Sequence, residues 1–348
     1  MDRWKPEIRR VLAWIAAASL WTATACSRGE AAPAEKADAG DYETHVLRYQ
    51  GSAGAVTFPE LAEDLGYLAP VRLEYVGSTI SGPQDIQAAL TGDTDFGGAF
   101  NGSIVNLIAA RAPLHAVIAL SSLDATTFGG FYVLDDSSIR KARDLIGKKV
   151  AMNTFGAHTE FMLKEYLERN GLTKSEIAKV TLVVVPPVNG EQVLRERQVE
   201  VCALSGILRD KALERGGIHA LFTDYGLFGP ITSASYVMTD AFLAKKPHTA
   251  RKFVDATARA IEWTRSTPRA DVIERFRRIL ARRKRNEDPS ALKYWRSVSA
   301  ETKGGVIAQK DFQIWVDWLV RDGQLQAGQF KASNMFTNAL NPYYAPGE

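Results

Sequence analysis

Short apolar segments alternate with helix-like segments along this chain, and this order predicts its fold class. Within residues 75–103, a strand-like segment is followed by a polar loop, a helix-like segment, a second strand and a Gly/Asn/Ser loop that opens another helix. This order is typical of an open α/β sheet, in which loops at the carboxyl ends of strands present helix N-termini to a ligand. The stretch therefore predicts a binding site, and nothing in it requires a catalytic step.

The same order of segments occurs twice, which predicts two lobes. The first set spans residues 44–137 and the second spans residues 138–231, in a chain of 348 residues that exceeds what one core usually supports. A strand at 236–238 is predicted to pair with residues 131–134, so that two chain crossings join the lobes as a hinge. Residues 232–348 would return to lobe 1 and end in helices. The predicted fold class is α/β, with two doubly wound lobes, a two-crossing hinge and a helical C-terminal tail packed on lobe 1.

The N-terminus has the pattern of a bacterial export signal. Basic residues precede an apolar run at 11–24 that is too short to span a bilayer, and Ala23-Thr24-Ala25-Cys26 resembles a lipobox. We expect residues 1–25 to be a signal peptide, and residues 26–43 to be a lipidated Cys26 followed by a flexible tether. The protein would then be a membrane-anchored lipoprotein of the periplasm or another extracytoplasmic face. A secretory signal cut near Ala25 and a cytosolic helix are the alternatives.

Charge and cysteine usage exclude several functions. Removing the signal removes four basic and two acidic residues, so the formal net charge falls from +3 by two units and gives no general attraction to nucleic acid. We interpret the basic run at 275–285 as a solvated helix face rather than an anion-binding surface. Cys202 lies in the apolar run 199–204, which favours a buried packing residue over a nucleophile. No metal-binding or cofactor motif is present, so neither a metal nor a cofactor is predicted.

Small polar residues stand before four predicted helices. They are Ser81-Gly82, Asn101-Gly102-Ser103, Thr154-Phe155-Gly156 and Ser205-Gly206. Ordinary N-capping explains each one singly, but all four follow strands, two in each lobe. If they converge across a cleft, their N–H groups favour an anion. His158 lies at a loop-to-helix junction, where it either lines the cleft or faces solvent.

Three segments resemble a known family. SGPQDIQAALTGDTDFGGA at 81–99 is similar to the segment after the second strand in the nitrate, sulfonate and taurine family of ABC-transporter solute-binding proteins. SSIRKARDLIGKKVAM at 137–152 resembles the Asp-Leu-x-Gly-Lys segment of the same family, and NTFGAHTEFML at 153–163 resembles the start of its next helix. The similarity extends over most of residues 44–265.

The resemblance implies a type II periplasmic-binding-protein fold that closes on a small solute and docks on an ABC permease. The solute would be a small organic molecule, with an anion of the sulfonate, nitrate or taurine class favoured, and the protein would be a monomer without enzymatic activity. By motif position the cleft-lining residues would be Gln50, Gly51, Ser78, Thr79, Asn101, Gly102, Thr154, Phe155 and Gly156, to which the helix starts add His158 and Ser205.

One departure from the family pattern leaves the ligand open. Many members carry Trp-x-Pro where this chain has Ser205-Gly206-Ile207, so sulfonate is not assumed. Two other functions remain as alternatives. Thiamin-pyrimidine synthases share this fold, but they carry a cysteine-rich segment that this chain lacks. A ligand sensor for a membrane receptor has no sequence feature that separates it from a transport protein.

Overall fold

The computed structural model describes residues 42–345, apart from 53, 284, 286 and 297–299. The predicted signal peptide, Cys26 and most of the predicted tether lie outside the described residues. The described part of the chain belongs to a single unit. None of the helices in that part has the length and apolar character needed to cross a bilayer.

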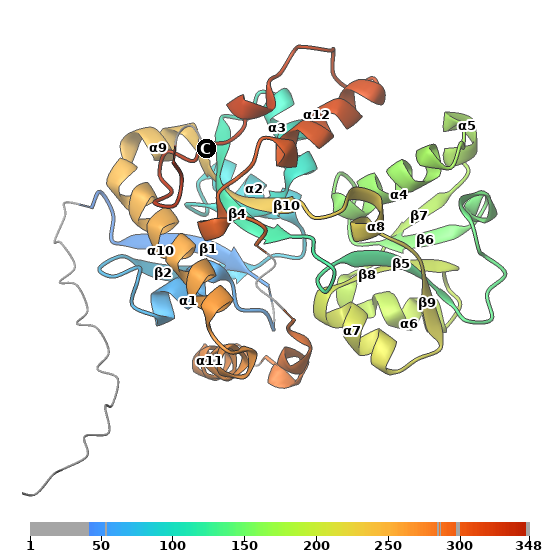
Figure 1. The fold of residues 1–348 in the computed structure, drawn as a ribbon, viewed down its shortest axis with the longest axis horizontal. Helices are drawn as coiled ribbons and strands as arrows, with labels where there is room; N and C mark the ends of the chain where they lie inside the picture. The colour runs from blue at the N-terminus through green and yellow to red at the C-terminus, as the bar shows by residue number, and fades with distance from the viewer. Residues whose placement is uncertain (1–41, 53, 284, 286, 297–299, 346–348) are drawn as a thin grey trace, which may run out of the picture. The chain divides into compact units, whose positions relative to one another are not determined.

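Lobe 1 is the part of the chain built on two small sheets, β1-β2 and β3-β10-β4 (Figure 1). In the first, β1 (Val46–Gly51) pairs in parallel with β2 (Arg72–Ser78). In the second, β10 (Thr232–Thr239) lies between β3 (Gly97–Phe100) and β4 (Leu114–Ser122) and is antiparallel to both. The side chains of β3 and most of those of β4 are buried, as expected for short apolar strands covered on both faces.

Lobe 2 is built on one five-stranded sheet, in the order β7-β6-β8-β5-β9. The strands are β5 (Gly129–Leu134), β6 (Lys149–Met152), β7 (Thr181–Val184), β8 (Val201–Ser205) and β9 (Ile218–Thr223). β6 is parallel to β7 and β8, whereas β5 is antiparallel to β8 and β9. The predicted class, an α/β fold of two lobes, is thus observed.

The predicted pairing of the return strand was wrong. Residues 236–238 belong to β10, which pairs with β3 and β4, while residues 131–134 belong to β5, which pairs with β8 and β9. Two crossings do join the sheets, and they lie side by side where the N–H of Leu123 donates to the carbonyl of Ile231 at 2.8 Å. The strands that meet at the crossing are therefore β4 and β10, because β4 leads the chain out of the lobe 1 sheet and the antiparallel β10 brings it back.

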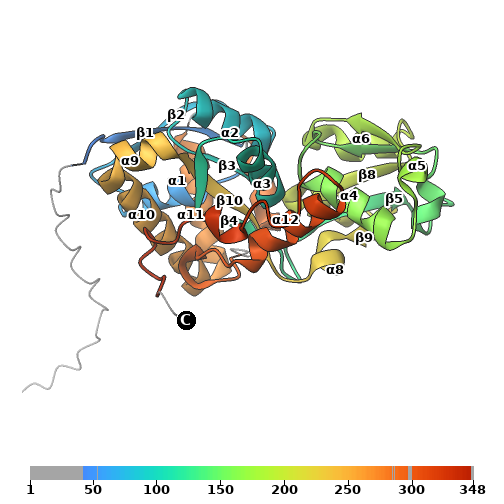
Figure 2. The same cartoon turned by 90° about the horizontal axis from the view of Figure 1, so that it is seen from above.

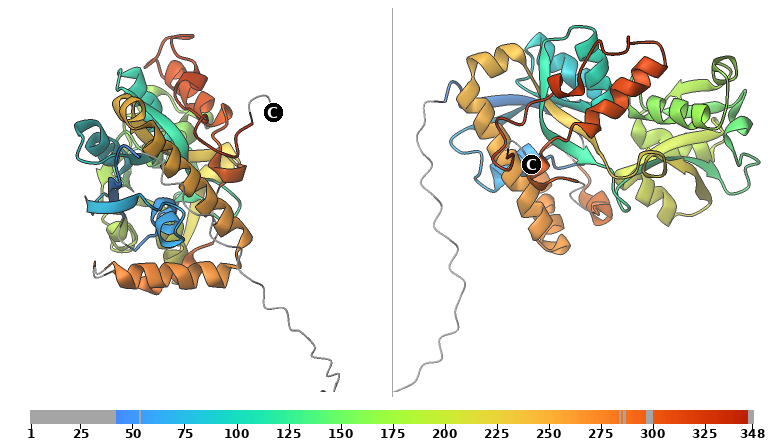
Figure 3. Two further views of the ribbon diagram at one scale, coloured as in Figure 1. Left: turned by 90° about the vertical axis from the view of Figure 1, so that its left-hand side faces the viewer. Right: turned by 45° about the horizontal axis from the view of Figure 1, so that its top comes forward.

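The helices surround these sheets. In lobe 2 they are α4 (His158–Arg169), α5 (Lys174–Ile177), α6 (Gly190–Arg195), α7 (Gly206–Glu214) and α8 (Asp224–Phe228). The others are α1 (Phe58–Asp64), α2 (Gly82–Thr91), α3 (Asn101–Ala109), α9 (Asp240–Lys245), α10 (Pro247–Ser266), α11 (Arg269–Arg282) and α12 (Lys310–Arg321). Phe253 and Ile261 of α10 pack in one core with Leu47 of β1 and Phe276 of α11. Figure 3 shows the ribbon of the long helix α10 beside the sheets of lobe 1.

Helix α12 carries the predicted apolar stripe into a core. Phe312, Trp315, Val316 and Leu319 are all buried, against α3 and around Phe100. The ring of Trp315 lies 4.5 Å from that of Phe100, and Phe161 of α4 lies 4.6 Å from Trp318, so α12 contacts elements of both lobes (Figure 2). The C-terminal helix thereby helps to hold α3 and α4 together.

Thr57 caps α1 with a reciprocal pair of hydrogen bonds. Its Oγ1 accepts from the N–H of Glu60, and Glu60 Oε2 accepts from the N–H of Thr57 at 2.9 Å. We expect Thr57→Ala to lower the free energy of unfolding by about 1 kcal/mol, because an N–H of the first turn loses its partner. Urea unfolding would measure this loss. Thr57→Ser keeps the hydroxyl and should cost less, and equal losses in both variants would contradict the capping role.

Candidate functional site

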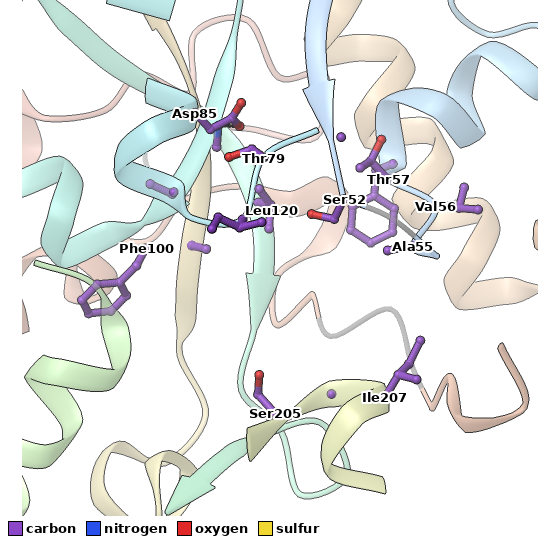
Figure 4. A pocket seen from close by; sticks show the side chains of 18 of the residues that line it. Ser52, Ala55, Val56, Thr57, Thr79, Asp85, Phe100, Leu120, Ser205 and Ile207 are labelled. Carbon is purple, nitrogen blue, oxygen red and sulfur yellow. Dashed lines mark hydrogen bonds between the residues drawn. The ribbon is translucent and has the colours of Figure 1, made fainter. Parts of the chain in front are cut away.

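A cavity of about 630 Å³ lies between residues of both lobes. Lobe 1 contributes the ends of β1 and β2, the start of α2 and parts of β3 and β10; lobe 2 contributes Ser205 and the start of α7. Figure 4 shows Thr79 and Asp85 on one side of this space and Ser205 and Ile207 on the other. The volume is in the range of small-molecule sites, and the position at strand ends is the one expected for an α/β protein.

Aromatic rings line the lobe 1 side of the cavity. Tyr49 stacks on Phe96 with ring centres 6.0 Å apart, and Tyr236 meets Phe96 edge to face at 5.9 Å. Gly98 lies beside the Tyr236 ring, which a Cβ at that position would approach to 3.4 Å, and the same Cβ would come within 2.4 Å of Leu120 Cδ1. A side chain at Gly98 would therefore require the end of Leu120 to move.

The glycines of the family motif are explained by packing of α2 on β3. A Cβ on Gly82 would lie 2.6 Å from the Cβ of Ala99, and a Cβ on Gly97 would lie 2.6 Å from the carbonyl oxygen of Asp85. These contacts are too close for any side chain, so the helix approaches the strand only where glycine is present. The glycines of the Gly-Pro-Gln and Asp-Phe-Gly elements thus allow α2 to pack closely on β3 in the cavity wall.

Asp85 is a buried carboxyl group in that wall. It lies on α2, lines the cavity and is 8% exposed. Its Oδ2 accepts a hydrogen bond from the N–H of Gly98 at 2.7 Å, while its Oδ1 is buried and has no hydrogen-bond partner among the described residues. Burial raises the pKa of Asp85 from 3.8 to about 7, against the opposing effect of the Gly98 N–H. The carboxyl group is therefore part protonated near neutral pH.

The loop after β1, described at residues 52 and 54–57, is flanked by an arginine cluster, Arg283 and Arg285, which follows the end of α11. Arg283 Nη2 donates to the carbonyl of Ala55 at 2.6 Å, and its Nη1 lies 3.2 Å from Glu60 Oε1 and 3.7 Å from Glu287 Oε1. The N–H of Gly54 donates to Glu287 Oε1 at 2.9 Å. Because this loop lines the cavity, the arginine cluster positions part of the site.

The expectation of a solvated basic face was wrong for two of these arginines. The side chain of Arg283 is 7% exposed, and Arg285 lies over the ring of Tyr75 at 3.4 Å and donates to Tyr49 Oη at 2.9 Å. Residues 283 and 285 follow the last turn of α11, so helical periodicity does not apply to them. Arg277, within the helix, is half exposed and matches the expectation.

The lobe 2 side of the cavity carries an ion-pair network. Arg209 contacts Asp210 Oδ1 through Nε at 2.8 Å and Nη2 at 2.6 Å, and its Nη1 donates to the carbonyl of Phe128 at 2.6 Å. Arg296 Nε donates to Asp210 Oδ2 at 3.1 Å, and the Arg296 side chain is half exposed. The guanidinium of Arg209 is thus held by protein groups, whereas the side chain of Arg296, which also lines the cavity, stays half exposed.

The structure brings four of the predicted site residues together in the large cavity: Gln50, Gly51, Thr79 and Ser205. Ser78 is next to this group in sequence, but its Oγ is hydrogen bonded to Tyr75 Oη at 2.6 Å and it does not line the cavity. These positions all lie at the carboxyl ends of β1, β2 and β8, where the strand pattern predicted a site.

The predicted residues at the start of α3 lie elsewhere. Asn101 is fully buried; its Nδ2 donates to the carbonyl of Thr232 at 2.9 Å and its Oδ1 accepts from Ser235 Oγ at 2.8 Å. Gly102 faces the ring of Phe100, which a Cβ would approach to 2.5 Å. Neither residue lines the cavity, because the side chain of Asn101 ties α3 to β10.

The predicted loop before α4 also lies outside the large cavity. Thr154, Phe155 and Gly156 do not line it, and Phe155 is exposed. The N–H of Gly156 donates to Glu160 Oε2 at 2.7 Å, and its carbonyl accepts from Ser103 Oγ at 2.5 Å, a contact between α3 and the lobe 2 loop. The backbone groups of Gly156 are therefore occupied by protein partners.

His158 lines a smaller cavity of about 210 Å³, which shares Phe100, Asn153 and Ser205 with the large one. Its Nε2 lies 2.7 Å from Asp224 Oδ2, and its ring lies 4.6 Å from that of Phe100. Cys202 lines the same cavity; it is buried as predicted, and burial raises the pKa of its thiol to about 12. A thiol with that pKa is not a nucleophile near neutral pH.

Sequence reasoning missed Asp85, Tyr236 and the arginine cluster. The sequence does carry a signal for Asp85, which stands beside Ile86 and one helical turn before Ala89 on the apolar face of a predicted helix. Burying a carboxyl group at such a position costs free energy, so its presence there indicates a role. No comparable signal marks Tyr236. Within the described residues, no group of three His, Cys, Asp or Glu side chains is arranged to hold a metal ion.

Comparison with known proteins supplies a family and a fold. The family model described as NMT1/THI5 like matches residues 61–271, which is more than half of the chain. No curated protein sequence matches.

Solved structures match over most of the chain. The alkanesulfonate-binding protein SsuA from Xanthomonas axonopodis pv. citri is similar with a TM-score of 0.66 and 19% identity, over 85% of this chain and 99% of that one. The periplasmic nitrate-binding protein NrtA from Synechocystis PCC 6803 gives a TM-score of 0.65 and 14% identity, over 84% and 86%. The desulfurization enzyme DszB gives 0.59 and 16%, over 85% and 97%. The predicted type II periplasmic-binding-protein fold is confirmed.

Proposed function

Because this chain belongs to the NMT1/THI5-like family, we propose that it is the extracytoplasmic solute-binding protein of an ABC importer. The observation that carries the proposal is the cavity of about 630 Å³, whose lining comes from both lobes and lies beside the two strand crossings. A solute that contacts both walls binds the closed arrangement more tightly, and this difference in affinity would drive closure.

Four residues that line the cavity, Gln50, Gly51, Thr79 and Ser205, are proposed to contact the solute. An acidic group on that solute would bind at the lobe 2 wall, where the start of α7 and the half-exposed Arg296 offer N–H groups. Delivery to a permease, anchoring through a lipid on Cys26 and a monomeric state complete the proposal. The N-terminal pattern supports the lipid anchor, and the resemblance of residues 81–99 and 137–163 to solute-binding proteins of ABC transporters supports the permease and the monomeric state.

An enzymatic role is the second candidate, since the desulfurization enzyme DszB has a similar fold. The chemistry of Cys202 does not favour it, because the buried thiol has a pKa of about 12 and is the sole cysteine of the described part of the chain. A sensor role differs from transport only in the membrane partner. Loss of solute uptake on deletion of the gene would favour transport.

A thermal-shift panel tests solute binding. We expect one class among alkanesulfonates, taurine, nitrate, aromatic carboxylates and thiamin pyrimidines to stabilise the protein by about 2.7 kcal/mol at 100 times its dissociation constant. Ile207→Trp, which places a large ring in the cavity, should weaken that binding at least tenfold. Val188→Trp, at an exposed position that does not line the cavity, is the control. Equal affinities in both variants would show that the solute binds elsewhere.

A further inference from the structure

Two acceptor atoms in the wall of the large cavity lack partners. Asp85 Oδ1 and Gln50 Oε1 are both buried, and neither has a hydrogen-bond partner among the described residues. Buried polar atoms in folded proteins are nearly always paired, and an unpaired acceptor destabilises the fold. Two unpaired acceptors in one cavity wall therefore indicate a ligand that brings hydrogen-bond donors.

The groups packed around Asp85 bring no positive charge to it. α2 packs against β3, whose residues Gly97–Phe100 carry no titratable side chain, and against β10, which contributes Tyr236. Burial is the main cause that raises the pKa of Tyr236, so its hydroxyl remains neutral. Across the cavity, the charges of Arg209 and Arg296 are directed to Asp210. Asp85 is thus a carboxyl group without a cationic partner in the described part of the chain.

Aromatic side chains pack behind the same part of the wall. Tyr49, Phe96 and Tyr236 are buried and form a contiguous set of rings, and Tyr236 lies beside Gly98, whose N–H donates to Asp85 Oδ2. These rings keep the surroundings of Asp85 apolar, so its carboxylate is poorly solvated and would be stabilised by a cation that a ligand brings. The wall therefore combines unpaired acceptors with apolar surroundings that favour pairing with an ammonium group.

We propose that the lobe 1 wall of the cavity binds the ammonium group of an organic amine, with Asp85 and Gln50 as acceptors. The inference rests on the proposed solute-binding role and specifies the solute: it carries an amine. An acidic group on the same molecule would bind the opposite wall, near Arg296 and the start of α7, so the amine site is compatible with a zwitterionic solute.

Binding of an ammonium group at this carboxyl group has a measurable proton signature. Burial places the pKa of Asp85 at about 7, so part of the unliganded protein carries a proton there near neutral pH. A cation beside the carboxylate lowers this pKa, and the proton is then released on binding. A purely structural role of Asp85 would produce no such release.

The test uses three probes of similar size: benzylamine, benzyl alcohol and benzoate. We expect benzylamine to bind the full-length protein at least tenfold more tightly than either of the others. Calorimetric titration at pH 7 in two buffers of different ionisation enthalpy should show release of a fraction of a proton with benzylamine alone. Asp85→Asn should weaken benzylamine binding about tenfold or more and abolish the release, because an amide neither titrates nor pairs with a cation.

Asp93→Asn is the matched control, since Asp93 is exposed near the end of the same helix and does not line the cavity. It should change neither affinity nor proton release. Benzoate binding as tight as benzylamine, or unchanged benzylamine binding in Asp85→Asn, would overturn the amine site. Absence of benzylamine binding to the unmodified protein would also overturn it. The proposed function would survive each of these results if another solute in the wider panel bound and Ile207→Trp weakened it.

Discussion

Replacing Asp85 by Asn is expected to stabilise the protein much more at pH 8 than at pH 4, with a difference between the two pH values of up to about 4 kcal/mol. In the folded protein burial raises the pKa of this carboxyl group from 3.8 to about 7. A shift of about three units corresponds to about 4 kcal/mol between the protonated and ionised forms.

The sign follows from proton binding. Between pH 4 and pH 7 the folded protein holds the Asp85 proton more tightly than the unfolded chain does, so the free energy of unfolding falls as the pH rises through this window. The contribution is fully present below the unfolded pKa and is lost by about pH 8. Asn keeps an oxygen acceptor for the Gly98 N–H and has no proton to lose, so the variant lacks this decline.

Urea unfolding at pH 4, 6 and 8 would measure the effect. Asp93→Asn, at an exposed position of the same lobe, should shift the free energy of unfolding by no more than about 0.5 kcal/mol at any of these pH values. Parallel pH profiles for the unmodified protein and Asp85→Asn would mean that the carboxyl group is ionised at an ordinary pKa, and that water reaches it in solution.

Arg283→Met is expected to lower the free energy of unfolding by about 3–5 kcal/mol. Arg283 lies between the buried carboxylates of Glu60 and Glu287, whose side chains are 5% and 4% exposed. Glu60 would keep Arg285 at 3.3 Å, but Glu287 would keep only the N–H of Gly54 among the described partners. Removing one member of a buried ion pair leaves an uncompensated charge, which costs far more than loss of a surface pair.

Arg277→Met provides the comparison. Arg277 pairs with Glu274 on the exposed side of α11, and both side chains are about half exposed, so its loss should cost less than about 1 kcal/mol. Adding Glu287→Gln to Arg283→Met should recover part of the lost stability, since it removes the unpaired charge. Similar losses for Arg283→Met and Arg277→Met in chemical denaturation would contradict a buried network.

The arginine variant also separates stability from binding. Arg283 Nη2 holds the carbonyl of Ala55, and the loop that contains Ala55 lines the cavity. Where Arg283→Met remains folded, a weaker affinity for the solute would follow from a displaced loop rather than from a lost contact, because Arg283 itself does not line the cavity.

Local pattern was enough for the fold class, the family and the apolar helix faces. The alternation of strands and helices predicted two α/β lobes, and the 81–99 and 137–152 segments led to the family that the NMT1/THI5-like match supports. The stripe on α12 and the burial of Cys202 were also predicted and are observed. These features depend on neighbours in sequence, since a helix face repeats every three to four residues and a buried strand is a short apolar run.

Pairing and orientation were decided by tertiary structure. Small polar residues before four helices are visible in the sequence. Packing brings the starts of α2 and α7 to the large cavity, whereas Asn101 ties α3 to β10. Likewise, β10 pairs with β4 rather than β5, and the side chain of Arg283 is buried and that of Arg285 mostly covered, although both follow a basic helix face. The burial of Asp85, and with it the unpaired acceptor in the cavity wall, arises where α2 meets β3 through glycines. The free energy of burying a charged group or an amide depends on the partners that surround it. Those partners are distant in sequence and become neighbours only when the chain folds.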